Sequence, residues 1–390
     1  MEIVDVKAVT LKGKIMCGGP FWEERLVRPV DVYPKYKKVS AGEFLKVSEV
    51  ETEPVTSHVL IITDEGVTGV SSPIRGPIQL QIIDTQVKPF LLGEDPLAIE
   101  RLWDIMYRSC VHGRKGETMM AISAVDCALW DLIGKARGEP VYRLLGGPTR
   151  GEVRAYASTL GYSLDPKDVE KRAQQFVEEG YTAMKWFFRY GPSDGVKGMK
   201  KNLELVKTIR DAVGYDVDLM VDCWMSWSVP YTLKMAKKME RYELAWIEEP
   251  LMPDLLDGYA KLTSTLETPI SGGEHEYTRW GFKEILQKDA MDIIQPDITW
   301  AGGITEILKI CALASSYGVP VIPHTGCIEA TIQLLFSQTQ TLCPIAEYLI
   351  KYNQVFQSVY KNPLTPERGF FKPPTRPGLG IELDESKILE

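Results

Sequence analysis

The stretch Val217-Asp-Leu-Met-Val-Asp222 is a short apolar run that ends in an acidic residue. The same arrangement recurs along the chain, where short apolar runs lead to six acidic or otherwise polar residues: Asp222, Glu248, Glu274, Asp297, His324 and Glu347. The successive intervals between them are 26, 26, 23, 27 and 23 residues. Each interval is about the length of one strand, one helix and two loops, and such apolar runs are typical of buried parallel strands.

This alternation predicts an α/β fold in which a parallel barrel is built from strands that alternate with helices. The carboxyl ends of all strands of a (β/α) barrel meet on one face, so the six polar side chains are expected to converge on one pocket. The first barrel strand is predicted at 153–158 and the second at 181–188. Helices that cover them are predicted at 167–179 and 200–213.

The residues before the barrel predict a smaller domain. A chain of 390 residues exceeds a barrel of roughly 250 residues, so an attached domain is expected. Two strand patterns and three helical patterns come first, at 1–14, 56–70, 77–91, 96–109 and 119–135. We therefore expect an N-terminal α+β capping domain at 1–148, a barrel at 149–360 and a proline-containing C-terminal segment, 361–390, that returns to the cap.

The segment 18–54 lies between the two predicted cap strands and is too long for an ordinary connection within a compact domain. It carries aromatic and basic residues: Phe21, Trp22, Arg25, Tyr33 and Tyr36. We expect this segment to close over the barrel mouth and to select the substrate, with Tyr36 as a substrate contact. The alternative is a disordered surface loop.

The composition excludes several classes of protein. Apolar residues make up 44% and charged residues 25% of the chain, as in globular proteins with a substantial core. The net charge of −8 argues against a nucleic-acid surface, and no stretch is long and apolar enough to predict a membrane span. The start has no signal-peptide pattern, and the seven cysteines form no Cys-x-x-Cys pair. We expect a cytoplasmic protein with reduced thiols.

Asp222, Glu248 and Glu274 are three carboxylates at consecutive predicted strand ends. Carboxylate oxygens are the ligands that hard octahedral cations such as Mg²⁺ prefer, and three negative charges brought together require a cation. Any one of these residues alone would more simply be an exposed loop carboxylate. The shared interval and the flanking sequences Ile247-Glu-Glu-Pro250 and Ser271-Gly-Gly-Glu274 favour a metal site.

Asp297 and His324 end the next two predicted strands. A carboxylate that accepts a hydrogen bond from one imidazole nitrogen fixes the tautomer and raises the basicity of the ring for proton abstraction. Of the other three histidines, His58 and His112 fall in the cap and are expected to be structural. His275 directly follows a predicted metal ligand, so it either faces the pocket or packs behind that ligand.

Further motifs accompany these residues: Glu248-Glu-Pro250, Gln295-Pro-Asp297, Gly302-Gly-Ile304 and Pro323-His324. In this order they resemble the mandelate racemase subgroup of the enolase superfamily, nearly from end to end. Within that subgroup, the chain is similar to the L-rhamnonate dehydratase family on these segments: Ala124-Val-Asp-Cys-Ala-Leu-Trp-Asp131, Pro140-Val-Tyr-Arg-Leu-Leu-Gly-Gly147, Lys185-Trp-Phe187, Asp222-Cys-Trp-Met-Ser226, Gly273-Glu-His275 and Glu347.

The resemblance implies a capping α+β domain over a (β/α)7β TIM-like barrel. It also implies Mg²⁺-dependent dehydration of an acid sugar to a 2-keto-3-deoxy sugar acid. It assigns metal ligation to Asp222, Glu248 and Glu274, the catalytic dyad to Asp297 and His324, an enolate-side acid to Glu347 and charge compensation to Lys185. Glu347 would hydrogen-bond the enediolate if it is protonated. We expect substrate contacts from Lys185, His275 and Tyr36, and a homo-oligomer.

The chain also departs from its relatives. Many racemases and cycloisomerases of the superfamily carry Lys-x-Lys on the second barrel strand, whereas this chain has Lys185-Trp186-Phe187 and so lacks the second lysine base. Rhamnonate dehydratases tend to carry a histidine in the long cap loop and a serine-rich segment after the Pro-His motif. In this chain the segment 18–54 has no histidine, and Thr325 follows the Pro-His motif. These two regions shape the far end of the substrate, so the identity of the sugar stays open. We expect a one-base elimination by His324. A racemase or epimerase, a cycloisomerase of the same superfamily and a non-catalytic sugar-acid-binding barrel are the alternatives.

Overall fold

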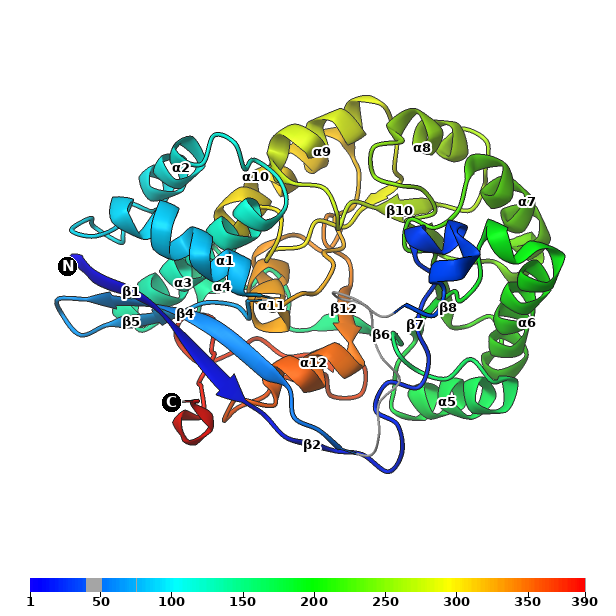
Figure 1. Cartoon of the computed structure of the whole chain (residues 1–390), viewed down its shortest axis with the longest axis horizontal. Coiled ribbons are helices and arrows are strands. Elements are labelled where there is room, and N and C mark those ends of the chain that lie inside the picture. The colour runs from blue at the N-terminus through cyan, green and yellow to red at the C-terminus, as the bar shows by residue number, and fades with distance from the viewer. Residues whose placement is uncertain (40–50, 75, 390) are drawn as a thin grey trace.

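The computed structural model of the chain describes residues 1–39, 51–74 and 76–389. An N-terminal domain is built on an antiparallel sheet, and a second, parallel sheet curls into a TIM-like barrel (Figure 1). The predicted α/β barrel with an α+β cap is confirmed.

Three antiparallel strands form the sheet of the cap, in the order β1 (Ile3–Lys12), β4 (Val55–Thr63) and β5 (Thr68–Val70). Val59 and Ile61 of β4 point to the same side of the sheet and are buried against the cap helices, because alternate residues of a strand share a face. A short pair, β2 (Ile15–Met16) with β3 (Glu51–Thr52), lies near the two ends of the long connection.

The cap contains four α-helices in the described residues: α1 (Pro77–Ile82), α2 (Ile99–Ser109), α3 (Glu117–Arg137) and α4 (Val141–Leu144). The helical pattern predicted at 77–91 is confirmed, but its second half is not α-helical: it is a π-helical turn at Ile83–Val87 and a 3₁₀ turn at Lys88–Phe90. Pro89 explains the change, because it has no amide hydrogen and its ring would collide with the carbonyl four residues earlier in a regular helix.

Seven parallel strands form the barrel sheet: β6 (Val153–Ser158), β7 (Ala183–Phe187), β8 (Asp218–Asp222), β9 (Trp246–Glu248), β10 (Ile270–Gly272), β11 (Ile293–Ile294) and β12 (Ala346–Leu349). Their order is β11-β10-β9-β8-β7-β6-β12. A parallel bridge between Ile294 and Val321 adds the segment that precedes His324 next to β11. The carboxyl ends of these strands therefore face one mouth.

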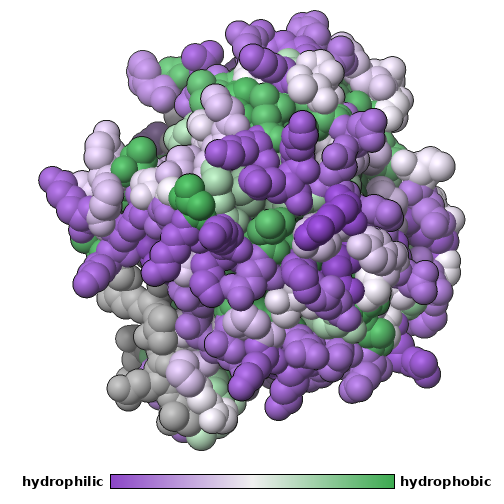
Figure 2. Space-filling view, turned by 90° about the vertical axis from the view of Figure 1, so that its right-hand side faces the viewer, coloured by the Kyte–Doolittle hydropathy of each residue, from purple (hydrophilic) through white to green (hydrophobic). Residues whose placement is uncertain are grey.

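Helices alternate with these strands and surround them: α5 (Pro166–Glu178), α6 (Gly195–Val213), α7 (Val229–Met239), α8 (Leu256–Thr263), α9 (Thr278–Gln287), α10 (Gly303–Tyr317), α11 (Ile328–Ser337) and α12 (Ile350–Gln357). On α5, Val169, Ala173 and Phe176 lie at helical spacing and are buried against the barrel. The outer face on this side of the molecule is mostly hydrophilic, with small apolar groups (Figure 2).

The C-terminal segment runs back from the barrel to the cap. β13 (Phe370–Phe371) pairs antiparallel with β6. Beyond it, the Leu379 amide donates to Asp131 of α3 at 2.8 Å, and Ile388 bridges to Leu11 of β1. The return of this segment to the cap agrees with the expectation, whereas the domain boundaries at 148 and 360 stay a prediction. Among the described residues, no helix combines the length and the apolar character needed to cross a membrane.

Candidate active site

Strands β7, β8, β9 and β12 each bring one charged side chain to the centre of the barrel. The Lys185 ammonium lies 2.8 Å from Glu347 Oε1 and 3.6 Å from Asp222 Oδ2, and it also contacts Glu248 Oε1. None of the four side chains is more than 2% exposed. The structure thus brings together four of the predicted site residues, which lie as much as 162 positions apart in the sequence (347 − 185).

Glu274 follows β10 and completes a group of three carboxylates. Asp222, Glu248 and Glu274 are all buried, and one oxygen from each lies within 4.8 Å of the others. Burial, reinforced by the neighbouring carboxylates, raises the pKa of Glu274 to about 7 and that of Asp222 well above its usual value. Buried oxygens whose negative charges oppose one another fit a hard divalent cation, which would favour their ionised forms.

Two neutral side chains orient Glu248. Trp246 Nε1 and Gln295 Nε2 donate to Glu248 Oε2 at 3.0 and 2.8 Å, which leaves Oε1 to face Lys185. The sequence analysis missed both residues. Each lies two positions before an assigned residue, Trp246 before Glu248 and Gln295 before Asp297. The two-residue period of strand β9, which places Trp246 and Glu248 on one face, could have identified Trp246. Gln295 lies beyond the end of β11, and the motif Gln295-Pro-Asp297 was its only signal.

Asp297 and His324 are paired as predicted. His324 Nδ1 lies 2.6 Å from Asp297 Oδ2, and the other carboxylate oxygen accepts from the backbone amide and the hydroxyl of Thr299, both at 2.6 Å. A carboxylate fixed in this way holds the imidazole in one orientation. The Nε2 atom of His324 then points toward Glu274, whose Oε2 lies 3.8 Å away.

The charge of His324 depends on the carboxylates around it. Burial by itself lowers the pKa of His324, but Glu274, the hydrogen bond with Asp297 and the more distant Glu347 raise it to about 10. A general base must be neutral before it accepts a proton. A cation held by Glu274 would act against this rise and bring the pKa closer to the range of a base.

The surroundings of Glu347 favour its ionised form. Its burial opposes ionisation, but Lys185 and then His324 lower the pKa of Glu347 to about 2. Its Oε2 accepts a hydrogen bond from the Thr325 amide at 3.0 Å. The charged lysine thus favours the ionised form, and the role of Glu347 as an acid stays a prediction. An ionised carboxylate accepts hydrogen bonds and donates none.

His275 lies near the barrel mouth. Its Nδ1 atom is 2.8 Å from Glu249 Oε2, and its side chain is 19% exposed. Burial lowers the pKa of His275, but Glu249 and Glu274 raise it to about 9. The ring lies between Trp224 and Trp300, with centroid distances of 5.9 and 5.5 Å. His275 thus contacts Glu249, the residue that follows the predicted metal ligand Glu248, and its ring remains partly accessible to solvent.

An apolar layer covers the charged residues on one side of the barrel. Phe187 and Leu349 each lie two positions beyond an inward charged residue, Lys185 and Glu347, so they continue the same inner face of β7 and β12. They pack with Leu26 from the long connection. The Lys185 ammonium lies 5.3 Å from the centroid of the Phe187 ring. This layer separates the lysine from solvent on that side.

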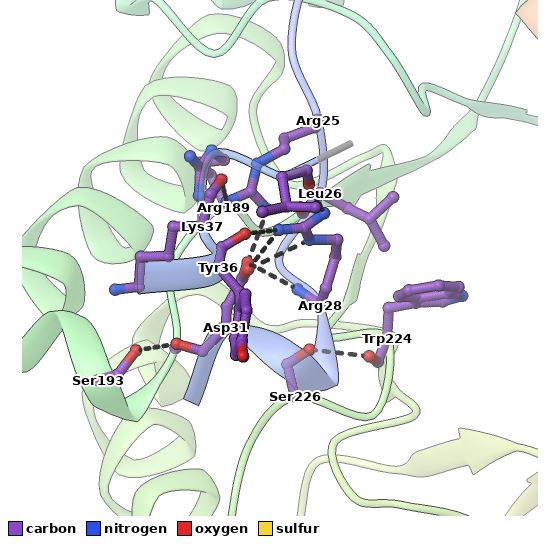
Figure 3. Close-up of polar contacts among 12 residues, drawn as sticks. Arg25, Leu26, Arg28, Asp31, Tyr36, Lys37, Arg189, Ser193, Trp224 and Ser226 are labelled. Carbon is purple, nitrogen blue, oxygen red and sulfur yellow. Dashed lines mark hydrogen bonds and ion pairs between the residues drawn. The ribbon is translucent and has the colours of Figure 1, made fainter. Parts of the chain in front are cut away.

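The connection is folded around a compact arginine cluster, drawn in Figure 3. Asp31 accepts from Arg25 NH1 at 2.6 Å and from Arg28 NH2 at 2.9 Å. Two hydrogen bonds attach the backbone of the connection to the barrel. The Val27 amide donates to the Phe188 carbonyl at 2.7 Å, and the Ser193 hydroxyl donates to the Asp31 carbonyl at 2.7 Å. Residues 21–39 therefore lie against the barrel end, as expected for a lid. Residues 40–50 of the predicted lid lie outside the described residues.

Tyr36 is the predicted substrate contact that the structure does not bring to the site. Its backbone carbonyl accepts from Arg28, and its ring is 39% exposed, with Tyr33 and the Lys35 ammonium as neighbours. The 3₁₀ turn Pro34–Tyr36 uses the backbone for the arginine cluster and leaves the ring at the surface. Sequence reasoning located the lid segment, but it could not fix the direction of one side chain within it.

His58 has the structural role that was predicted. It is fully buried in β4, and its Nδ1 atom lies 2.9 Å from the Ser71 carbonyl. Burial lowers the pKa of His58 to about 4, so the ring is neutral at physiological pH.

Comparison with known proteins agrees with this geometry. Residues 168–387 match the enolase C-terminal domain-like family, and residues 45–146 match the N-terminal domain of the mandelate racemase / muconate lactonizing enzyme family. An L-rhamnonate dehydratase from Saccharopolyspora erythraea is 35% identical over 98% of this chain and 97% of that protein.

Two solved structures share the whole fold. The rhamnonate dehydratase from Gibberella zeae complexed with Mg has a TM-score of 0.84 and 30% identity, covering 100% of this chain and 96% of that one. The 3,6-anhydro-D-galactonate cycloisomerase from Zobellia galactanivorans has a TM-score of 0.80 and 31% identity, covering 100% of both chains. The chain therefore belongs to the mandelate racemase and muconate lactonizing enzyme subgroup of the enolase superfamily, and it is an enzyme of that superfamily.

Proposed function

We propose that the protein is a Mg²⁺-dependent acid-sugar dehydratase that removes the proton α to the substrate carboxylate and eliminates the β-hydroxyl. The product would be a 2-keto-3-deoxy sugar acid. The observation that carries the proposal is the placement of the His324–Asp297 dyad directly beside three buried carboxylates. The similarity to an L-rhamnonate dehydratase over nearly the whole chain supports the same reaction class.

Asp222, Glu248 and Glu274 are the residues that would hold the cation. When bound, Mg²⁺ supplies positive charge that stabilises the negative charge developing on a substrate carboxylate. Trp246 and Gln295 keep Glu248 Oε2 occupied, so that Oε1 is directed to the centre of the site. This chain's own contribution is thus a fixed set of oxygens whose orientation is set before any ligand arrives.

His324 would take the α-proton at Nε2, because Nδ1 is engaged by Asp297. The resulting imidazolium would then give a proton to the departing hydroxyl on the same face of the substrate. Lys185 would offset the substrate's negative charge, and ionised Glu347 would hold Lys185 in place. Phe187 occupies the position where the second lysine of a Lys-x-Lys pair would lie, which supports one base rather than two.

An isomerase of the same superfamily is the second candidate, and one observation supports it. The cycloisomerase from Zobellia galactanivorans matches the fold about as well as the dehydratase does. The two reactions differ in their products, because a dehydratase releases water and forms a 2-keto acid whereas a cycloisomerase or epimerase conserves the elements of its substrate.

A panel of purified acid sugars tests the proposal. Each would be incubated with the protein and Mg²⁺, and NMR would follow loss of the α-proton signal and appearance of the 2-keto-3-deoxy product. His324→Asn is the matched control, since the asparagine amide is planar and polar but cannot act as a general base. We expect product with at least one sugar acid in the wild type alone. Isomerised substrate without a keto acid would favour the second candidate, and no conversion of any member would refute the dehydratase assignment.

We also propose that the protein is a homo-oligomer. Gel filtration with light scattering would test this proposal.

A further inference from the structure

The loop after β11 joins the catalytic dyad to the cap. Trp300 of this loop is 4% exposed and packs in the apolar core of the cap with residues of α2 and α3. Its ring lies 5.1 Å from the His324 ring and 5.5 Å from the His275 ring, measured between centroids. A barrel loop that carries active-site contacts is thus embedded in the other domain.

Cap side chains anchor the far end of this loop by hydrogen bonds. The Gly302 amide donates to Ser123 Oγ of α3 at 2.9 Å. The Thr305 amide, in the first turn of α10 directly after the loop, donates to Asp126 Oδ2 of α3 at 3.0 Å. From α2, Trp103 Nε1 donates to the Gly302 carbonyl at 2.8 Å. Ser123 and Asp126 are fully buried, so water does not replace these partners.

The two glycines make this close approach possible. Gly302 and Gly303 have φ angles of 126° and 79°, which other residues rarely adopt. A Cβ atom at Gly303 would lie 2.3 Å from Asp126 Oδ2. The backbone therefore touches the α3 carboxylate at a point where a side chain would displace the helix.

The near end of the loop is bonded to Asp297 itself. The amides of Trp300 and Ala301 donate to the Asp297 carbonyl at 3.1 and 2.8 Å. Thr299 holds the side-chain oxygen of Asp297 that does not face His324. A single compact turn, residues 297–303, is thus fixed to the dyad at one end and to the cap at the other.

We propose that Ser123 and Asp126 are positioning residues for the reaction: by anchoring the turn 297–303, cap helix α3 sets the position of Asp297 and hence the orientation of the His324 ring. This inference rests on the proposed function of His324 as the base. Docking of the cap is then part of assembling the base, in addition to any role of the cap in covering the substrate. A misplacement of about 1 Å at a reacting group can lower the rate about 10²-fold.

The test compares Ser123→Ala and Asp126→Ala with two matched variants. Asp126→Asn keeps an oxygen that can accept from the Thr305 amide. Glu100→Gln removes a different contact between cap and barrel, the 2.5 Å ion pair of Glu100 with Lys309, without touching the turn. Thermal unfolding would verify that each variant is folded, and calorimetry would measure Mg²⁺ affinity.

We expect Ser123→Ala and Asp126→Ala to lower kcat about 10- to 100-fold, with KM and Mg²⁺ affinity within about twofold of the wild type, because the base is displaced while the metal ligands are not. Asp126→Asn and Glu100→Gln should stay close to the wild type. Hydrogen–deuterium exchange in peptides covering 297–305 should become faster in the two alanine variants only.

Unchanged kcat in folded Ser123→Ala and Asp126→Ala would overturn the inference. It would also be overturned if Glu100→Gln lowered kcat as much, or if Mg²⁺ affinity fell in parallel with kcat, since either result indicates general loosening. Failure of the proposed function is distinguishable, because the wild type would then convert no sugar acid. The exchange measurement would still decide whether α3 fixes the turn, and unchanged exchange would contradict it.

Discussion

The two sides of the barrel mouth hold their charged groups in different ways. On the side of β7 and β12, Lys185 and Glu347 neutralise one another under an apolar layer. On the side of β11 and the segment that follows it, His324 is hydrogen-bonded through one nitrogen to Asp297, and its other nitrogen is directed toward the carboxylate group that would hold a metal. The first side compensates charge and the second side is able to move a proton, which is why one base accounts for the proposed reaction.

The largest expected effect separates the two sides directly. His324→Asn should lower turnover by about 10²- to 10⁴-fold or more, because it removes the general base. Lys185→Gln should retain measurable turnover with a raised KM, since this lysine offsets charge. Steady-state kinetics of both variants with a confirmed substrate would check this. The comparison would fail if His324→Asn remained active while Lys185→Gln did not.

Glu248→Gln should weaken Mg²⁺ binding and abolish turnover, because it removes one negative charge from the three-carboxylate group. Calorimetric titration with Mg²⁺ measures the first effect, and the Mg²⁺-induced rise in Tm gives an independent readout. Glu249→Gln distinguishes this group from the second candidate group, Glu249, Glu274 and His275, because it leaves Asp222, Glu248 and Glu274 intact. Full activity of the wild type after thorough chelation would contradict the assignment of the three ligands.

The pH dependence of stability should report the same carboxylate group. The pKa of Glu274 is raised to about 7 in the folded protein, so the folded state binds more protons than the unfolded state between about pH 4.5 and 7. Its contribution to the free energy of unfolding should therefore fall with rising pH, by roughly 3 kcal/mol at most. Urea unfolding of metal-free wild type and Glu274→Gln at pH 5 and pH 7 would measure the difference. The prediction would be contradicted if the free energy of unfolding changed equally between pH 5 and pH 7 in the two proteins.

The smallest effect is expected at the lid. Asp31→Asn should loosen the arginine cluster, because Arg25 and Arg28 lose the charge that pairs with them. We expect a rise in KM of roughly 10-fold with little change in Mg²⁺ affinity, as for a group that acts on substrate binding alone. Leu26→Ala, which changes the apolar contact and leaves the cluster intact, is the companion variant. An unchanged KM in both would favour a passive surface loop.

The sequence was most informative where one residue type recurred with the period of the fold. The interval of about 26 residues predicted the barrel, and strand ends that meet at one mouth predicted that Asp222, Glu248 and Glu274 would converge. The pairing of Asp297 with His324 followed from the same rule. These predictions needed only the topology, which short apolar runs specify well.

Other features depend on contacts that a linear pattern does not contain. The lowered pKa of Glu347 depends on Lys185, which comes from a strand far away in the sequence. The direction of the Tyr36 ring depends on which backbone carbonyls Arg28 uses. The anchoring of the turn 297–303 by Ser123 and Asp126 joins two domains through two hydrogen bonds, and the pattern of α3, including the segment 124–131 that carries the resemblance, does not reveal their partners.

Exchange of the substrate α-proton in D₂O tests the one-base account most directly. His324→Asn would be incubated with a confirmed substrate and Mg²⁺, and NMR would follow the α-proton signal over time, with the wild type as the positive control. We predict that the wild type consumes the substrate whereas the α-proton signal of the variant persists, because Phe187 occupies the position where a second lysine base would lie. Loss of the α-proton signal in the variant would show that another residue, with Lys185 as the first candidate, removes the proton, and the one-base account would be wrong.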